Sequence, residues 1–315
     1  MNFQTLLKIE DPEFYIDLAF RRAKEKSGEI RSSKLKGTRM EKSRYIETRK
    51  IEIIKDTIVE HLKKVLVSYP SIDQLPEFYL ELVKCTLDYV MLKKSLGALG
   101  WAIKRTDEMF RIYASKINKC NDLQKINQYR REFYGRFSSI LKQIRDELGY
   151  LEQARKIMKG FPTVKTSLPT VAIAGFPNVG KTTLLYELTG SKPEINDYAF
   201  TTKGINIGYY TKDKKKIQLL DTPGTLNRFN KMNNIEKQAY LAMKYVADKI
   251  IYIFDLTEPY PLKDQLKLYN RLKKENSNII VYMTKKKLID RKTFDEFKKK
   301  DYIDSVEGIK RVLVL

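Results

Sequence analysis

The sequence predicts an all-α helical bundle domain followed by an α/β domain whose mostly parallel sheet carries helices on both faces. Apolar residues recur at helical spacing from about residue 11 to 160, and short β-rich runs then alternate with helical segments. Between the two parts, Gly-Phe-Pro at 160–162 and Ser-Leu-Pro at 167–169 interrupt regular structure. We therefore expect one domain over residues 1–165 and a second over residues 166–315.

The helices of the first part are indicated by apolar residues four or eight positions apart. These residues are Ile46, Ile54, Ile58, Leu62 and Leu66, and later Phe133, Phe137 and Leu141. The stretch 121–159 keeps apolar residues near one face, so we expect a long helical segment that spans much of the bundle. Pro70 and Pro76 predict a connection between helices. Trp101 falls on an apolar row, which favours core packing over stacking on a base.

The second part reads as strands near 170–175, 205–211, 216–221, 249–255 and 278–283, with helices between most of them. The sequence Gly-Phe-Pro-Asn-Val-Gly-Lys-Thr at 175–182 lies between the first strand and a helical segment. Its glycines allow successive N–H groups to face phosphate oxygens, while Lys181 reaches the β- and γ-phosphates and Thr182 offers a hydroxyl to Mg²⁺. The alternative, a glycine-rich turn, lacks this strand and helix context. The loop predicts binding of a nucleoside triphosphate.

A second phosphate-site motif follows about forty residues later, where a predicted strand runs into Asp-Thr-Pro-Gly at 221–224. This position allows Asp221 to reach the magnesium shell and the Gly224 N–H to face the γ-phosphate. Alone, the four residues indicate only a turn. The order of the two motifs favours the nucleotide site.

The charge balance favours a polyanionic partner. The 315 residues carry 61 basic and 39 acidic side chains, a net charge of +22. Such a field steers a protein toward nucleic acid. Residues 21–50 hold 12 basic and 4 acidic residues, and the candidate RNA-binding residues are Arg31, Lys34, Lys36 and Arg39. The alternative is a solvated lysine-rich surface.

Several classes of protein are disfavoured by the composition. Two cysteines, Cys85 and Cys120, and no signal-like N-terminus suggest a reduced, cytoplasmic compartment. The longest apolar runs, such as 250–254, are too short to cross a membrane, so no membrane partner is expected. The single histidine, His61, makes a zinc site or a histidine-based triad untenable.

Four segments together resemble a known family of Obg-type, translation-factor-class GTPases. They are 175–182, Tyr-Ala-Phe-Thr-Thr-Lys at 198–203, Asp-Thr-Pro-Gly at 221–224 and Asn-Asn-Ile-Glu-Lys-Gln-Ala at 233–239. The helical half ending Leu-Gly-Tyr-Leu-Glu-Gln-Ala-Arg at 148–155 resembles the nucleolar GTP-binding protein 1 family of archaea and eukaryotes. The resemblance implies an α/β P-loop GTPase domain behind the bundle. It also implies GTP and GDP as ligands, and rRNA and ribosomal proteins of the large-subunit precursor as partners of a chain that is monomeric when free.

The same resemblance implies roles for individual residues. Lys181, Thr202, Gly224 and Asn178 are the implied catalytic group, with Thr201 as the alternative for Thr202. Thr182, Thr202 and, through water, Asp221 are the implied Mg²⁺ ligands, and Asn178 matches an asparagine that holds K⁺ in related GTPases. A turn-stabilising asparagine is the alternative. The full nucleotide-binding set comprises Gly175, Phe176, Pro177, Asn178, Val179, Gly180, Lys181, Thr182, Thr183, Phe200, Thr201, Thr202, Asp221, Gly224, Thr284, Lys285, Lys287, Ser305 and Val306.

The base-reading motif departs from the family pattern. The family places Asn-Lys-x-Asp after the last predicted strand, and this chain has Thr-Lys-Lys-Lys at 284–287. Lysine at 287 offers no acceptor to guanine, and each missing hydrogen bond to a carboxylate is worth about 1.5 to 3 kcal/mol. Asp290 is a candidate substitute, and a solvated basic loop is the alternative for 284–287.

Two further departures concern the end of the chain and the catalytic water. Ser305 and Val306 stand where a Ser-Ala motif backs guanine, and the chain stops at Leu315, which leaves little room for a closing helix. Thr225 occupies the position of the water-orienting glutamine, so slow intrinsic hydrolysis is expected.

The sequence thus supports a GTP-hydrolysing switch in large-subunit assembly that binds rRNA through basic surfaces. The alternative is a catalytically weak or nucleotide-promiscuous ribosome-binding module with a degenerate guanine site.

Overall fold

The computed structural model describes residues 2–32, 36–190, 205–213, 215–224, 233–257, 261–285, 297 and 301–314, except the side chains of Asn234 and Val314. The chain forms two compact units. The helical unit consists of residues 3–74 and 87–159, and the sheet unit consists of residues 1–2, 75–86 and 160–315. Residues 75–86 and 160–165 thus group with the sheet unit, although the sequence pattern assigned them to the first domain.

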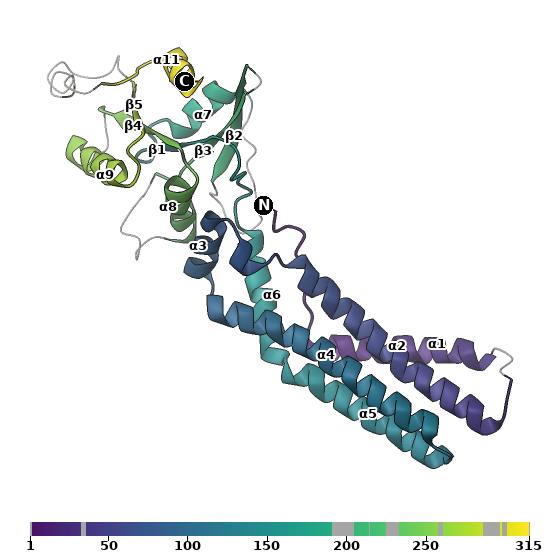
Figure 1. Cartoon of the computed structure of the whole chain (residues 1–315). Coiled ribbons are helices and arrows are strands. Elements are labelled where there is room, and N and C mark those ends of the chain that lie inside the picture. The colour runs from purple at the N-terminus through teal and green to yellow at the C-terminus, as the bar shows by residue number, and fades with distance from the viewer. Residues whose placement is uncertain are drawn as a thin grey trace. The chain divides into compact units, whose positions relative to one another are not determined.

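The helical unit is built from α1 (Pro12–Ser32), α2 (Arg39–Ser68), the short 3₁₀ helix η1 (Ile72–Gln74), α4 (Tyr89–Lys119), α5 (Leu123–Gln143) and α6 (Arg145–Lys159). Helix α4 packs against α2, α5 and α6, and α1 packs against α2. Helices α2, α4 and α5 lie lengthwise beside one another (Figure 1). The predicted core rows are confirmed at Ile54, Ile58 and Leu62 and at Phe133 and Phe137, which are all fully buried.

Polar caps define where these helices begin. Thr38 accepts a hydrogen bond from the Glu41 N–H, and the Glu41 carboxylate accepts one from the Thr38 N–H, which completes a capping box at the start of α2. Asp88 and Asp122 cap α4 and α5 in the simpler way, each by accepting a backbone N–H. The segment between Pro70 and Pro76 connects helices, as predicted, and contains η1.

The stretch 121–159 is helical, but it consists of two helices, because the chain leaves helical geometry at Ile144 (φ −102°, ψ 20°), where α5 ends. Ile144 is itself buried, so an apolar pattern that continues through the break hides it. The expectation that Trp101 packs in the core was wrong, because its side chain is 44% exposed. Leu99, Ala102 and Ile103 of the same turns of α4 are buried, so the core-facing row runs through these neighbours and not through Trp101.

The sheet unit contains a five-stranded sheet of order β2-β3-β1-β4-β5. Its strands are β1 (Thr170–Ala174), β2 (Asn206–Lys212), β3 (Lys215–Asp221), β4 (Lys249–Asp255) and β5 (Ile279–Thr284). Its helices are α3 (Glu77–Thr86), α7 (Lys181–Thr189), α8 (Asn234–Tyr245), α9 (Leu262–Glu275) and α11 (Val306–Val314). Strands β3, β1, β4 and β5 are parallel, and β2 is antiparallel to β3. The predicted fold, a mostly parallel sheet behind a helical part, is confirmed.

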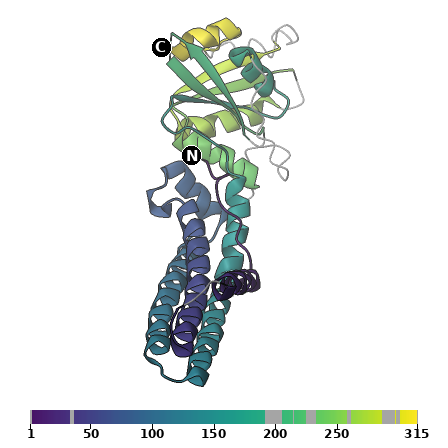
Figure 2. The same ribbon diagram turned by 90° about the vertical axis from the view of Figure 1, so that its right-hand side faces the viewer.

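Alternate residues of each central strand face opposite layers. Val171, Ile173, Ile251 and Ile253 pack with side chains of α7 and α11. Ala172, Ala174 and the intervening residues of β4 pack with side chains of α8 and α9. Figure 2 shows helices on both faces of this sheet. Because both faces are covered, the central strands are apolar along most of their length, as buried parallel strands usually are.

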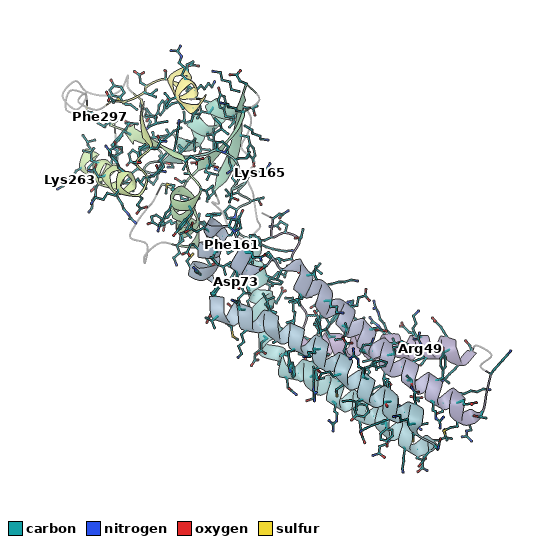
Figure 3. All side chains as sticks on the ribbon, in the orientation of Figure 1. Arg49, Asp73, Phe161, Lys165, Lys263 and Phe297 are labelled. Atoms are coloured by element: carbon teal, nitrogen blue, oxygen red, sulfur yellow. The ribbon has the colours of Figure 1, made fainter. Side chains whose placement is uncertain are left out.

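The chain beyond β5 returns to the sheet. Ile303 pairs with Tyr282 in a parallel bridge, its N–H donating to Val281 and its carbonyl accepting from Met283, at 2.9 Å each. Phe297, labelled in Figure 3, packs its ring 4.8 Å from that of Phe254 in the α9 layer. A closing helix, α11, follows at once, so the expectation that the chain leaves it little room was wrong.

Residues 75–86 belong to the sheet unit through specific contacts. The Tyr79 hydroxyl donates to the Pro162 or Val164 carbonyl, at 2.9 and 3.0 Å, and accepts from the Val164 N–H at 2.9 Å. Phe161 and Lys165, both labelled in Figure 3, belong to the same segment leading into β1. Phe161 is buried, and the Lys165 ammonium lies 5.0 Å from the centre of the Tyr209 ring.

Candidate nucleotide-binding site

The phosphate loop connects the carboxyl end of β1 to the first turn of α7. Gly175, Asn178 and Gly180 adopt positive φ angles of 150°, 61° and 96°. A side chain at Gly175 would place a Cβ 2.8 Å from the Ile253 carbonyl oxygen, so β4 leaves room only for glycine there. Asparagine tolerates the left-handed region better than most residues do, so the positive φ of Asn178 is consistent with the alternative role of an asparagine that stabilises a turn. The loop thus has a strand before it and a helix N-terminus after it, as a phosphate cradle requires.

Lys181 is buried at the start of α7, and its ammonium donates to the Phe176 carbonyl at 2.7 Å. The side chain therefore folds back over the loop it belongs to. Burial lowers the pKa of Lys181, and the nearby Asp221 carboxylate opposes this effect. A triphosphate beside the ammonium would raise the pKa of Lys181, because nearby negative charges stabilise the charged form of a buried amine.

Thr182 and Asp221 meet across the space between α7 and β3. The Thr182 hydroxyl donates to Asp221 Oδ2 at 2.6 Å, and the Asn206 amide donates to the same oxygen at 3.1 Å. Burial raises the pKa of Asp221, although these two hydrogen bonds and the Lys181 charge act in the opposite direction. The sequence reasoning missed Asn206. Its register opposite Asp221 in the β2–β3 hairpin was the available signal.

The second oxygen of Asp221 makes the site suited to a hydrated cation. Asp221 is 5% exposed, and its Oδ1 is buried with no hydrogen-bond partner among the described residues. A buried acceptor without a partner is uncommon and costs about 1 to 3 kcal/mol. A hydroxyl beside a carboxylate is the oxygen donor set that Mg²⁺ takes in nucleotide sites, usually with several of its waters retained. The residues present therefore fit the magnesium that P-loop GTPases use with their nucleotide.

Gly224 lies against the phosphate loop itself. A Cβ at Gly224 would fall 2.3 Å from the Pro177 nitrogen and 2.5 Å from its Cα, distances that no side chain can occupy. Only glycine allows the chain after β3 to approach the loop so closely. Two residues before Gly224, the Thr222 hydroxyl donates to the Ile173 carbonyl at 2.8 Å, which joins this part of the chain to β1.

Beyond the first turn of α7 lies a hollow of about 790 Å³, which we call the base hollow. Its lining comprises Val179, Gly180, Thr183, Leu184, Glu187, Tyr282, Met283, Thr284, Lys285 and Asp304. The Thr284 hydroxyl lies 3.1 Å from the Val179 carbonyl and 3.3 Å from the Phe254 carbonyl, so it can donate to either. Lys285 pairs with the buried Asp255 at 2.5 Å. The first two residues of the variant base motif thus tie β5 to the phosphate loop and to β4.

Ser305 and Val306 occupy the start of α11 and are not among the residues that line the base hollow. The Ser305 hydroxyl accepts the Gly308 N–H at 3.2 Å, and the Ser305 carbonyl accepts the Ile309 N–H at 3.2 Å. Ser305 therefore caps a helix. Its neighbour Asp304 lines the hollow, and so does Glu187 from α7. The sequence reasoning singled out neither carboxylate.

Several predicted site residues lie outside the described residues. They are Lys34, Phe200, Thr201, Thr202 and Lys287, together with Thr225 and Asp290. Of the candidate RNA-binding residues, Arg31, Lys36 and Arg39 are described and exposed. Arg31 and Arg39 line a hollow of about 430 Å³ in the helical unit. No described helix has the length and apolarity that a membrane span needs.

Both halves of the chain match known protein families. Residues 3–165 match the family described as NOG1 N-terminal helical domain, and residues 170–285 match the family described as 50S ribosome-binding GTPase. An uncharacterised protein of Methanocaldococcus jannaschii is 38% identical over 292 residues, which cover 91% of this chain and 81% of that protein. Nucleolar GTP-binding protein 1 of Saccharomyces cerevisiae is 29% identical over 305 residues. That match covers 95% of this chain but only 46% of the yeast protein.

Solved structures similar to this chain include GTPases of other kinds. The G domain of the T. maritima FeoB iron transporter is 28% identical, with a TM-score of 0.39, over 47% of this chain and 97% of that chain. A structure of Era with MgGDPNP and a 16S ribosomal RNA segment is 30% identical, with a TM-score of 0.36, over 46% of this chain and 56% of that chain.

The family assignment rests on the sequence matches. The model of the NOG1 N-terminal helical domain covers more than half of the chain, and the GTPase model covers the phosphate loop, Asp221 and Thr284. The order of the matches is the order of the two parts in the structure. The chain belongs to the nucleolar GTP-binding protein 1 family of P-loop GTPases.

Proposed function

We propose that this protein binds and hydrolyses GTP as a conformational switch during assembly of the large ribosomal subunit, and that its helical unit binds rRNA. The chain spans under half of the yeast relative, so the activity of that whole protein comes to this chain only as part of the proposal. The family assignment supports a GTPase. The ribosomal role is supported by the family's name for the GTPase domain and by the basic helical surface.

One observation carries the nucleotide half of the proposal. Thr182 and Asp221 share a 2.6 Å hydrogen bond, and the second Asp221 oxygen is buried without a partner among the described residues. With Lys181 beside them, these groups can hold a hydrated Mg²⁺ and the β- and γ-phosphates at the mouth of α7. Bound there, Mg²⁺ would neutralise charge that develops on the phosphate oxygens.

The switch would act through the residues that contact the γ-phosphate. We infer that the Gly224 N–H contacts the γ-phosphate, and the close approach of Gly224 to Pro177 of the phosphate loop supports this role. We infer that Thr202 closes over the magnesium in the GTP form, with Thr201 as the alternative, and that loss of the phosphate releases both segments. Thr225 cannot orient water as a glutamine does, so intrinsic hydrolysis is slow. Asn178 would hold K⁺ beside the transferred phosphate.

Cosedimentation tests the switch. Full-length protein is mixed with large-subunit precursors in the presence of GDP, a non-hydrolysable GTP analogue or no nucleotide, and with Lys181→Ala as the nucleotide-deficient control. The proposal predicts more bound protein with the GTP analogue than with GDP, and no such difference for Lys181→Ala. Equal binding in all three states would contradict a switch.

The role of Asn178 is tested by measuring phosphate release in K⁺ and in Na⁺. Hydrolysis should be slower in Na⁺ if Asn178 holds K⁺ beside the transferred phosphate.

The RNA half of the proposal rests on basic groups at two neighbouring turns of the helical unit. Arg31 and Arg39 flank the connection between α1 and α2. Arg44 donates to the Cys120 carbonyl at 2.8 Å, which holds the start of α2 beside the turn between α4 and α5. That turn carries a second hollow of about 620 Å³, and its cationic lining residues are Lys116, Lys119 and Lys125. Basic groups from separate helices therefore gather at the same end of this unit.

The salt dependence of RNA binding tests this surface. Neutralising Arg31 and Arg39 together as glutamines should make the negative slope of log K against log salt less steep, by about 0.7 to 0.9 for each phosphate contact that is lost. Lys63→Gln with Lys64→Gln is the matched control, because these exposed lysines lie roughly 36 Å further along α2 at 1.5 Å per residue. Equal slopes for the two double variants would show that the charges of Arg31 and Arg39 are merely solvated.

A second candidate function follows from the base motif. Lysine at 287 supplies no acceptor for guanine. A nucleotide-promiscuous ribosome-binding module would bind GDP, ADP and xanthosine diphosphate alike. Competition among the three nucleotides distinguishes the two functions.

A further inference from the structure

The base hollow contains a carboxylate that can take the place of the one missing from the base motif. We propose that Asp304 accepts hydrogen bonds from the ring N–H and the amino group of guanine, in the role that the family gives to an aspartate at position 287. The proposal rests on the proposed function in one respect, namely that the phosphate loop holds a guanine nucleotide.

The fold delivers Asp304 to the correct edge of the sheet. Ile303 pairs in parallel with Tyr282, through hydrogen bonds of 2.9 Å to Val281 and from Met283. The residue after Ile303 therefore leaves the sheet beside the end of β5, where Thr284 and Lys285 lie. Ligands of open parallel sheets bind outside the carboxyl ends of the strands. Asp304 reaches that edge from the segment before α11 and is exposed there.

The hollow has the arrangement that a nucleoside needs. Gly180 and Thr183, at the loop and the first turn of α7, form one part of the lining, and Thr284 and Asp304 belong to another. A nucleotide whose phosphates occupy the loop can extend its base into this hollow, because the hollow adjoins Gly180 and the first turn of α7. Guanine presents an N–H and an amino group side by side, and the two oxygens of a carboxylate accept both. Adenine has an acceptor at the same ring position, so a carboxylate would repel it.

Close packing fixes the segment that carries Asp304. A Cβ at Gly308 would lie 2.6 Å from Ile303 Cγ2 and 3.0 Å from the Ser305 hydroxyl, so only glycine lets α11 begin this close to the segment. Ser305 then caps the helix through its hydrogen bond to the Gly308 N–H. Asp304 thus lies between a residue held in the sheet and a residue held at a helix start. Such placement favours a specific contact with a base, because little ordering is left to occur on binding.

The other carboxylates near the hollow fit the role less well. Asp255 is buried and engaged by Lys285 and by the Thr257 hydroxyl and N–H. Glu187 lines the hollow, but it lies one turn beyond Thr183 on α7, roughly 9 Å along the helix from Lys181. Burial raises the pKa of Tyr282, and Glu187, Asp304 and Glu307 add to this effect in that order. The three carboxylates therefore surround one tyrosine, and of these only Asp304 follows a residue paired with the end of β5.

An exchange of nucleotide preference tests the assignment. Xanthine carries a carbonyl oxygen where guanine has its amino group, so an amide at position 304 would donate to xanthine and oppose guanine. Wild type, Asp304→Asn, Glu187→Gln as the variant of the rival acceptor, and Glu307→Gln as the control are titrated with fluorescent GDP, and GDP, ADP and xanthosine diphosphate compete. For Asp304→Asn we expect GDP affinity to fall at least about tenfold and xanthosine diphosphate affinity to rise at least about tenfold. Glu307→Gln, at an exposed carboxylate of α11 that does not line the base hollow, is the control and should leave both affinities unchanged.

The outcomes separate this inference from the proposed function. If wild type prefers GDP to ADP and Asp304→Asn behaves like wild type, the role of Asp304 is overturned and the guanine nucleotide function stands. If Glu187→Gln produces the exchange, Glu187 is the acceptor and Asp304 is not. If wild type binds GDP and ADP equally, both the guanine preference and the role of Asp304 fail. Thermal unfolding of the nucleotide-free variants checks that each is folded.

Discussion

The Thr284 hydroxyl lies 3.1 Å from the Val179 carbonyl and joins the end of β5 to the phosphate loop. Val179 is buried, so this hydrogen bond holds the loop at its midpoint. The family expects an asparagine at position 284. In this chain threonine, which has a shorter side chain, makes the hydrogen bond to the Val179 carbonyl.

Removing that hydroxyl should loosen the loop. Thr284→Val keeps the shape of the side chain but leaves the Val179 carbonyl without this donor, so we expect about 1 kcal/mol less stability and weaker GDP binding. Thr284→Ser keeps the hydroxyl and serves as the control. Chemical unfolding and a labelled GDP titration measure the two effects. Identical stability and GDP affinity of the valine and serine variants would show that the hydrogen bond between Thr284 and Val179 is dispensable.

Magnesium dependence should reside in Asp221. Asp221→Asn removes the charge beside Thr182, and loss of a group that orients metal-bound water typically costs about 10- to 100-fold in metal affinity. Isothermal titration of GDP with and without EDTA should show a large magnesium effect in wild type and a small one in the variant. Asp213→Asn is the control, because Asp213 is an exposed residue of the same hairpin with a positive φ of 51° that asparagine also tolerates. An undiminished magnesium effect in Asp221→Asn would remove Asp221 from the site.

The close approach of Gly224 to Pro177 predicts a variant impaired in hydrolysis. In Gly224→Ala the added Cβ meets backbone atoms at 2.3 and 2.5 Å, so the chain after β3 must move away from the phosphate loop. We expect GTP hydrolysis to fall more than GDP affinity does, because the displaced N–H serves the γ-phosphate. Single-turnover phosphate release and GDP titration provide the comparison. Gly149→Ala, in open space on α6, should change neither.

His61 gives the helical unit a pH-dependent contribution to stability. Burial lowers the pKa of His61 below its usual 6.5, and the charge of Arg22 lowers it further. Between the folded pKa and 6.5 the unfolded chain binds more protons, so stability rises with pH through this window and is lost as pH falls through it. The difference in unfolding free energy between wild type and His61→Gln should therefore increase as the pH rises toward the usual pKa of 6.5 and then level off above it. A difference that shrinks with rising pH would show a raised pKa instead.

Much of the sheet unit could be predicted because its strands are buried on both faces. Continuous apolar runs such as 250–254 have few other interpretations, and the phosphate loop needs a strand before it and a helix after it. The helical unit was harder. The break at Ile144 occurs inside an unbroken apolar pattern, and Trp101 lies on a helical row yet faces solvent.

The base hollow was the least predictable part of the site. Its carboxylate comes from a segment whose position depends on pairing between Ile303 and Tyr282, two residues far apart in the sequence. A local motif suggests only local replacements such as Asp290, which lies outside the described residues. Asn206 was missed for the same reason, since its partner Asp221 lies across a hairpin.

The central claim is that the loop at 175–182 binds guanine nucleotides. Fluorescent GDP bound to the full chain in Mg²⁺ is displaced by increasing GDP or ADP, with Lys181→Ala as the variant that lacks the buried ammonium. We expect ADP to compete at least about tenfold less well than GDP, and we expect Lys181→Ala to bind the probe weakly. Equal competition by GDP and ADP, or undiminished binding by Lys181→Ala, would contradict it.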